Sequence, residues 1–283
     1  MTRNTHIPLE IILQILEAEL PTGRPNCIID ISKTNVQQIL TWAKDGYSST
    51  LPSTIRLHEV SSVYLGLSIE EIQSLRNSGL VRDLFIELGG SVRRLIVDLP
   101  FRRIAQQHSI DAHIDAMYSR GLQALSNLEE LTTLGGLPVL EFWRAEFDIN
   151  RMWPKLRRVA AFKVNLGEEA LWYNVARTRT LEHLVIAMPY VLRRQTWNIK
   201  ESIGGKEWNT EEGGDSTYAR PLKIVIAHHE FCAPMLDTSD AHIHDPCGLL
   251  DVSASEIPVV AKRVDWLCKE WLVKSAKDDT LWD

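Results

Sequence analysis

The sequence predicts an α/β fold in which short apolar strands alternate with longer helices, stacked unit after unit as a strand–helix solenoid. Two observations predict it. Apolar residues recur at every second position in five of six short apolar segments, and the stretches between these segments have helical spacing of apolar residues. The strand-like segments recur about every 25 to 40 residues, and each unit has an apolar strand face that it cannot bury alone. Neighbouring units are therefore expected to stack into one parallel sheet with a layer of helices on one side.

Most of the predicted strands carry a polar residue between their apolar ones. That alternation favours a sheet with one covered face over a doubly wound sheet, whose strands are apolar on both faces. The predicted strands are 61–67, 93–99, 128–134, 156–162, 182–188 and 222–228.

Helices are expected between the strands, in two segments before them and in one segment after them. The last helix, about Ala261 to Lys277, places Val264, Leu267, Cys268, Trp271 and Leu272 on one apolar face and is expected to cap the end of the solenoid. Loops are expected at 21–33, which holds Pro21, Gly23 and Pro25, at the acidic, glycine-rich 200–219, and in the irregular stretch 231–258. The other predicted helices are 7–20, 34–44, 69–88, 103–124, 139–150, 167–179 and 189–200.

Composition and charge exclude several classes of protein. The chain has 283 residues, of which 45% are hydrophobic and 24% are charged, values typical of a soluble globular protein. Its net charge of −6 argues against a nucleic-acid partner. No apolar run approaches the roughly 18 residues that span a bilayer, so no membrane segment is expected. Four cysteines are too few for a disulfide scaffold, which predicts a reducing compartment, the cytoplasm or the nucleus.

Several stretches together resemble a known family. In chain order they are IPLEIILQILEAELP (7–21), SSVYLG (61–66), GLVRDLFIELGGSVRRLIVDLPFR (79–102), LSNLEEL (125–131), MWPKLRRVAAF (152–162), LEHLVIAMP (181–189), RPLKIVIA (220–227) and TLWD (280–283). On these residues the chain resembles fungal F-box-like proteins with a degenerate leucine-rich-repeat body.

The resemblance implies two regions. Residues 1–59 would be a degenerate F-box-like helical segment, and residues 60–283 would be a leucine-rich-repeat-like α/β solenoid with a C-terminal capping helix. It also implies that residues 7–20 dock a ubiquitin-ligase adaptor. Residues 27–59 depart from the F-box pattern, because they are polar and are interrupted by Gly46 and Pro52.

The uncovered strand face is the predicted ligand surface. If the leucines and valines of each strand point toward the helices, the alternate residues point to the other, concave face. The middle of that face is apolar and the starts of its strands are basic, which suits a groove for a protein or a small molecule. The alternative is a solvated face covered by long basic side chains. The candidate ligand-binding residues are Arg94, Ile96, Arg158, Phe162, Val185 and Lys223.

Few residues indicate catalysis. Nucleophile elbows, P-loops and dinucleotide-binding glycine motifs are absent from the sequence. Should the protein be an enzyme, the candidate catalytic residues are Asp98, His183 and His229, because an imidazole oriented by a carboxylate can act as a general base. His242 and His244 have no third metal ligand fixed by spacing, so the sequence predicts neither a metal nor another cofactor.

A basic run at 151–163 includes Lys155 and Arg157 and contains no acidic residue. Such a run either attracts an anionic ligand or forms a solvated edge.

These features favour a recognition protein that binds a protein partner through its concave sheet. The competing interpretation is a small-molecule enzyme of fungal secondary metabolism, a cyclase, isomerase or hydrolase, with a pocket on the same face. Whether the protein is an enzyme stays open at this point.

Overall fold

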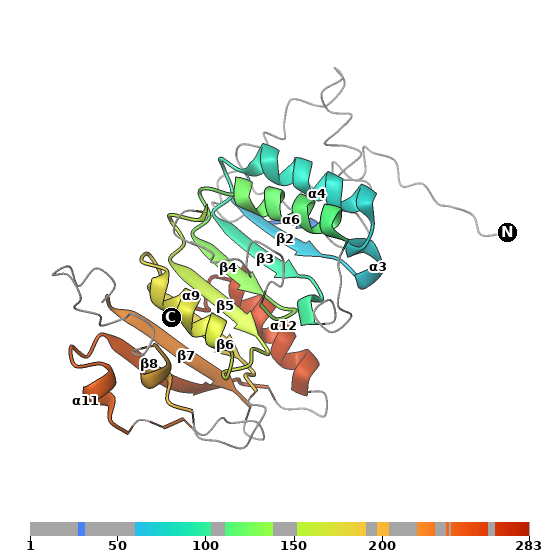
Figure 1. Ribbon diagram of the computed structural model, residues 1–283. Coiled ribbons are helices and arrows are strands. Elements are labelled where there is room, and N and C mark those ends of the chain that lie inside the picture. The colour runs from blue at the N-terminus through green and yellow to red at the C-terminus, as the bar shows by residue number, and fades with distance from the viewer. Residues whose placement is uncertain are drawn as a thin grey trace.

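An eight-stranded parallel sheet forms the centre of the molecule. The computed structural model describes residues 28–31, 60–102, 111–137, 152–190, 197–203, 220–229, 236–237, 239–259 and 264–282. In this part of the chain the strands lie in the order of the sequence, each one paired in parallel with the next (Figure 1). They are β1 (Ile28–Ile31), β2 (Ser62–Gly66), β3 (Arg94–Asp98), β4 (Glu130–Thr133), β5 (Arg158–Phe162), β6 (His183–Ala187), β7 (Leu222–His228) and β8 (Leu250–Glu256).

Helices alternate with the strands, so the predicted α/β class is confirmed. The described helices are α3 (Ile69–Ile72), α4 (Leu75–Leu88), α6 (Ala112–Ala124), α9 (Glu169–Arg177), α10 (Ile199–Ile203), α11 (Ala241–His244) and α12 (Val264–Lys277). Side chains cap the first turns of α3 and α6. Ser68 and Glu71 form a reciprocal capping box at α3, and the side chain of Asp111 accepts a hydrogen bond from the His113 amide at the start of α6.

The six predicted strands correspond to β2–β7, but the sequence analysis missed two further strands. Strand β1 lies within the loop predicted at 21–33, where the preceding prolines and glycine indicate a turn. It pairs with β2, so the sheet begins inside the segment assigned to an F-box-like domain. Strand β8 lies in the stretch predicted to be irregular. The predicted helices 7–20, 34–44 and 139–150 lie outside the described residues.

One face of the sheet packs against α4, α6 and α9, which lie on the same side in Figure 1. Strand residues such as Leu95, Val159 and Leu184 are fully buried or nearly so on this face, as the period-two pattern predicted. Two buried indoles fix helices to neighbouring backbone: Trp153 Nε1 donates to the carbonyl of Leu122 at 3.0 Å, and Trp172 Nε1 donates to the carbonyl of Leu166 at 2.7 Å.

The opposite face, the one predicted to be concave and called the concave face below, is covered in its middle by α12, which runs behind the strands in Figure 1. Helix α12 has Cys268, Leu272 and Ala276 at four-residue intervals, and all three are buried. They pack against the apolar residues of the concave face, among them Ile96 and Ala160. The last helix therefore lies across the sheet rather than at the end of the stack, where the sequence analysis had placed it.

Removing the Leu272 side chain tests this packing. The Leu272→Ala variant should lose about 2–4 kcal/mol of the free energy of unfolding, because it leaves a cavity between α12 and the sheet. Lys274→Ala, which truncates an exposed side chain of the same helix, is the matched control and should change stability by less than about 0.5 kcal/mol. Urea denaturation followed by circular dichroism measures both. Equal stability of the two variants would mean that α12 does not pack on the sheet.

Candidate functional site

A row of titratable side chains, five of them charged residues and one a histidine, crosses the sheet at the amino ends of strands β3–β8, on the concave face. Each member is the direct register partner of the next, so neighbouring side chains start about 5 Å apart. We call it the amino-end row; its members are Arg94, Glu130, Arg158, His183, Lys223 and Asp251.

The first half of the amino-end row holds the chain's own C-terminal segment, residues 264–282. Glu130, whose side chain is 14% exposed, accepts hydrogen bonds from Arg158 Nη1 at 2.9 Å and Trp282 Nε1 at 3.3 Å. It also forms an ion pair with Arg94 Nε at 3.0 Å. Arg94 also pairs with Asp279 at 3.0 Å, and the Arg158 guanidinium lies 5.8 Å from the centre of the Trp282 ring. Two candidate ligand-binding residues, Arg94 and Arg158, therefore have partners within the chain.

Asp98 holds α12 at the other end of strand β3. Its carboxylate accepts hydrogen bonds from Lys269 Nζ at 2.7 Å and from Tyr64 Oη at 3.3 Å. Lys277 Nζ lies 4.7 Å from the centre of the Tyr64 ring, which adds a second contact between this helix and the sheet. The carboxylate of Asp98 therefore holds α12 against the sheet.

The three apolar candidates for ligand binding lie under α12. Ile96, Phe162 and Val185 are buried in the same apolar cluster as the helix residues Cys268 and Leu272. Their surface faces the chain's own helix rather than an open groove.

The three candidate catalytic residues are not brought together. Asp98 ends β3 and His229 follows β7, four strand steps away, which at about 4.8 Å per step separates them by about 19 Å. His229 is 5% exposed and its Nε2 lies 3.2 Å from the carbonyl oxygen of Val259. His183 lies at the opposite end of the strands, in the amino-end row.

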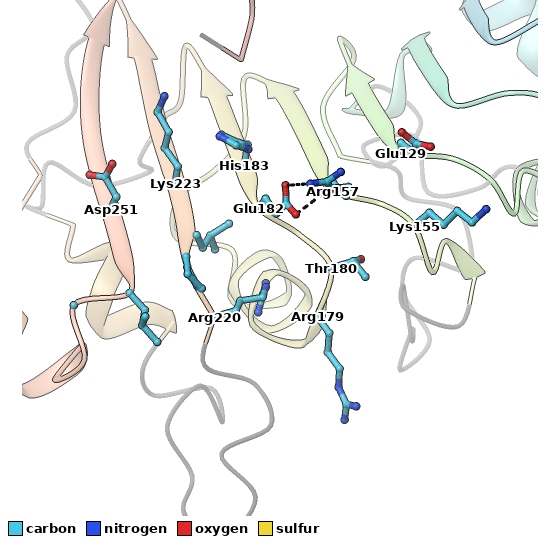
Figure 2. Close-up of a pocket in the computed structure, with 14 residues that line it drawn as sticks. Glu129, Lys155, Arg157, Arg179, Thr180, Glu182, His183, Arg220, Lys223 and Asp251 are labelled. Atoms are coloured by element: carbon cyan, nitrogen blue, oxygen red, sulfur yellow. Dashed lines mark hydrogen bonds and ion pairs between the residues drawn. The ribbon is translucent and has the colours of Figure 1, made fainter.

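An open concavity lies at the amino ends of β5–β8. It has a volume of about 990 Å³, and Figure 2 shows its lining residues around the tails of the strand arrows. We call it the amino-end cleft. Two of the sequence candidates line it, His183 and Lys223, as do Lys155 and Arg157 of the basic run. Its other charged lining residues are Glu129, Arg179, Glu182, Arg220 and Asp251.

The charged residues of the cleft differ in what they contact. Arg157 and Glu182 form a two-pronged ion pair, with Nε to Oε1 at 2.9 Å and Nη2 to Oε2 at 2.8 Å, drawn as dashed lines in Figure 2. Arg220 is structural: it donates to the carbonyls of Val175 and Leu181, each at 2.9 Å, and so ties the end of α9 to the start of β7. Burial lowers the pKa of Arg220 to about 10, which leaves it charged at neutral pH.

The surroundings of His183 favour its neutral imidazole form. Burial lowers its pKa below the ordinary value, and the neighbouring charges of Arg158 and Lys223 lower the pKa further. Its Nδ1 is buried and has no hydrogen-bond partner among the described residues.

Comparisons of the chain with models of protein families, with curated proteins and with solved structures gave no match. Within the described residues, none of the helices combines the length and the apolar composition that crossing a membrane requires. The same residues contain no group of three or more histidine, cysteine, aspartate or glutamate side chains placed to hold a metal ion.

Sequence reasoning missed Arg179, Thr180 and Glu182 as lining residues of the cleft. They come from the turn between α9 and β6 and the start of that strand. Two signals pointed to this edge: the basic starts of the strands, with His183 and Lys223, and the basic run at 151–163, whose position at the amino end of β5 places two cations there.

The Glu130→Gln variant tests the clamp on the C-terminal segment. It should lose about 2 kcal/mol of the free energy of unfolding, because Arg158 then loses its carboxylate partner and Arg94 keeps only Asp279. Glu129→Gln is the neighbouring control: its ion pair with Arg93, at 3.6 Å, is exposed, and its loss should cost less than about 0.5 kcal/mol. Chemical denaturation of both variants gives the comparison, and a loss as small for Glu130 as for Glu129 would contradict the clamp.

Proposed function

We propose that the protein is a non-catalytic recognition module, in which a leucine-rich-repeat-like strand–helix solenoid binds a protein partner at the amino-end cleft. The strand order supports the solenoid. Doubly wound sheets reverse their strand order at a switch point, where they bind ligands, whereas the order β1–β8 never reverses. Each strand lies beside the strand that comes next in the sequence, as in repeat proteins.

The observation that carries the proposal is the position and character of the cleft. Helix α12 covers the apolar middle of the concave face, whereas a cleft lies open at the amino ends of four successive strands. This cleft is open and is rich in charges of both signs, which suits the polar groups of another protein chain.

The charges of the cleft favour an acidic partner. Lysine and arginine outnumber aspartate and glutamate among its lining residues, although the whole chain has a net charge of −6. A local basic surface on an acidic protein steers a negatively charged partner toward that one place.

The resemblance to F-box-like proteins adds a second part to the proposal. If residues 7–20 dock a ubiquitin-ligase adaptor, the cleft would select the protein that the ligase modifies, in the cytoplasm or the nucleus. This part rests on sequence alone, because residues 7–20 lie outside the described part of the chain. Co-purification of the full chain with the adaptor tests it, and failure to form a complex at micromolar concentrations would discard it.

A small-molecule enzyme is the second candidate function, and one observation favours it. His183 lines the cleft, and its lowered pKa favours the neutral imidazole that a general base requires. Neither Asp98 nor His229 is near enough to assist it. In an enzyme, His183→Gln would abolish turnover, whereas a recognition module would have no turnover to lose.

Charge reversal in the cleft tests partner binding. The double variant Arg179→Glu, Lys223→Glu should bind its partner at least about tenfold more weakly, because it replaces two attractive charges by repulsive ones. The control reverses two exposed cations elsewhere, Arg120→Glu on α6 and Lys274→Glu on α12, and should bind as the wild type does. Partners retained from extracts by the wild type are identified by mass spectrometry, purified and titrated against all three proteins.

Photo-crosslinking locates the contact on the wild-type background. A photoreactive residue at Thr180, inside the cleft, should crosslink the purified partner, and the same residue at Arg120 should not. Undiminished binding by the double variant, together with crosslinks from Arg120 only, would refute the proposed site.

A further inference from the structure

Strand β8 forms one edge of the sheet, beside β7 (Figure 1), and no described strand pairs with its outer side. It has seven residues, whereas β1 at the other edge has four. The side chains from Ser253 to Glu256 are all exposed, so neither face of this half of β8 is covered. The sheet therefore ends on a long and accessible edge.

Two hydrogen bonds at the ends of β8 show which of its backbone groups face outward. The N–H of Ile257 donates to the carbonyl of His228 at 2.8 Å. The carbonyl of Leu249 accepts from the N–H of Leu222 at 2.9 Å. Because the direction of bonding alternates along a strand, the odd-numbered residues bond to β7 and the even-numbered residues point away from it. The outward set is Leu250, Val252, Ala254 and Glu256.

The chain satisfies only the start of this outward set. Oδ2 of Asp245 accepts a hydrogen bond from the N–H of Leu250 at 3.0 Å. No described group pairs with the outward N–H and C=O groups of Val252, Ala254 and Glu256.

The usual protections of an edge strand are also missing from β8. Edge strands are commonly blunted by a lysine, a proline or a bulge, because open backbone groups attract another strand. The sequence LDVSASE contains neither lysine nor proline, and its pairing with β7 is regular throughout. Strand β8 therefore has the features of a strand that accepts a further strand.

We propose that β8 pairs in antiparallel orientation with β8 of a second copy of this chain, across a two-fold axis at Ser253, and joins the two sheets into one. This register uses the whole strand. It also sets outward residues opposite outward residues, so that N–H groups meet C=O groups. The pairs are Leu250 with Glu256, Asp251 with Ser255, Val252 with Ala254, and Ser253 with itself.

The sequence of β8 is complementary to itself in this register. Its two acidic residues, Asp251 and Glu256, lie near opposite ends, so each faces a neutral residue and no like charges meet. Small side chains occupy the middle, where Ser253 and Ala254 lie next to the axis. A two-fold axis also closes the assembly at two copies. The inference does not depend on the proposed function.

Sedimentation equilibrium of the full chain between about 1 and 200 µM tests the dimer. A single strand pair is a small interface, so dissociation at about tens of micromolar is expected. Ala254→Pro removes an N–H that faces the second copy and leaves the bonds to β7 in place, so it should weaken dimerisation at least about tenfold. Ala254→Ser keeps the N–H and is the matched control, which should dimerise as the wild type does.

A disulfide tests the register without depending on the proline variant. Opposed residues at the axis have Cα atoms about 4.5 Å apart, within reach of a disulfide. In a Cys247→Ser background, which removes an exposed thiol, Ser253→Cys should form a link between two copies of residue 253 under mild oxidation. Ser255→Cys is the control, because its two copies would lie about 14 Å apart and should not link. Peptide mapping by mass spectrometry identifies the linked residues.

Three results would overturn the proposal. The first is a chain that stays monomeric over the whole concentration range. The second is dimerisation of a folded Ala254→Pro variant with wild-type affinity. The third is a link at residue 255 without one at residue 253, which would indicate a different register. Growing chains of copies without the link at 253 would likewise refute it, because they indicate head-to-tail pairing of β8 with β1.

Discussion

The in-register pairing of parallel strands is the constraint on which the rest of the structure depends. Because side chains alternate between the two faces of a strand, register fixes two sets of rows at once. One set, with Leu95, Val159 and Leu184, forms the core against the helices. The other set forms the concave face, so the amino-end row of charges is a direct consequence of the same pairing that builds the core. A register shift of one residue on any strand would move its core side chains to the concave face and its concave-face side chains to the core.

The sequence predicted the strands β2–β7 and their two faces, because burial against helices leaves a period-two pattern of apolar residues. It missed β8, whose residues are mostly exposed at the edge of the sheet and show little apolar alternation. It also missed β1, which follows a loop-like run of proline and glycine. Such strands form because they pair with a neighbouring strand, and the local sequence pattern carries no information about that neighbour.

The position of α12 could not be predicted from the local sequence pattern either, for a different reason. The stripe formed by Cys268, Leu272 and Ala276 predicts that one side of the helix is buried, but not what it is buried against. The same holds for the site. Ile96 and Val185 were correctly placed on the concave face, but only the fold shows that a helix covers them. The cleft at the amino ends arises from turns and strand starts that come together through the sheet, and Arg179 and Glu182 have no motif in common.

Helix α12 also affects how the chain can be made. In simple repeat proteins each unit contacts only its neighbours, so folding can spread from one unit to the next. Here Arg94 on β3 contacts the carbonyl of Ala276, 182 residues later, and the helix crosses strands that are synthesised well before it. On the ribosome, the apolar middle of the concave face stays uncovered until residues 264–282 emerge. During that interval the growing chain exposes a surface that chaperones bind and that favours aggregation.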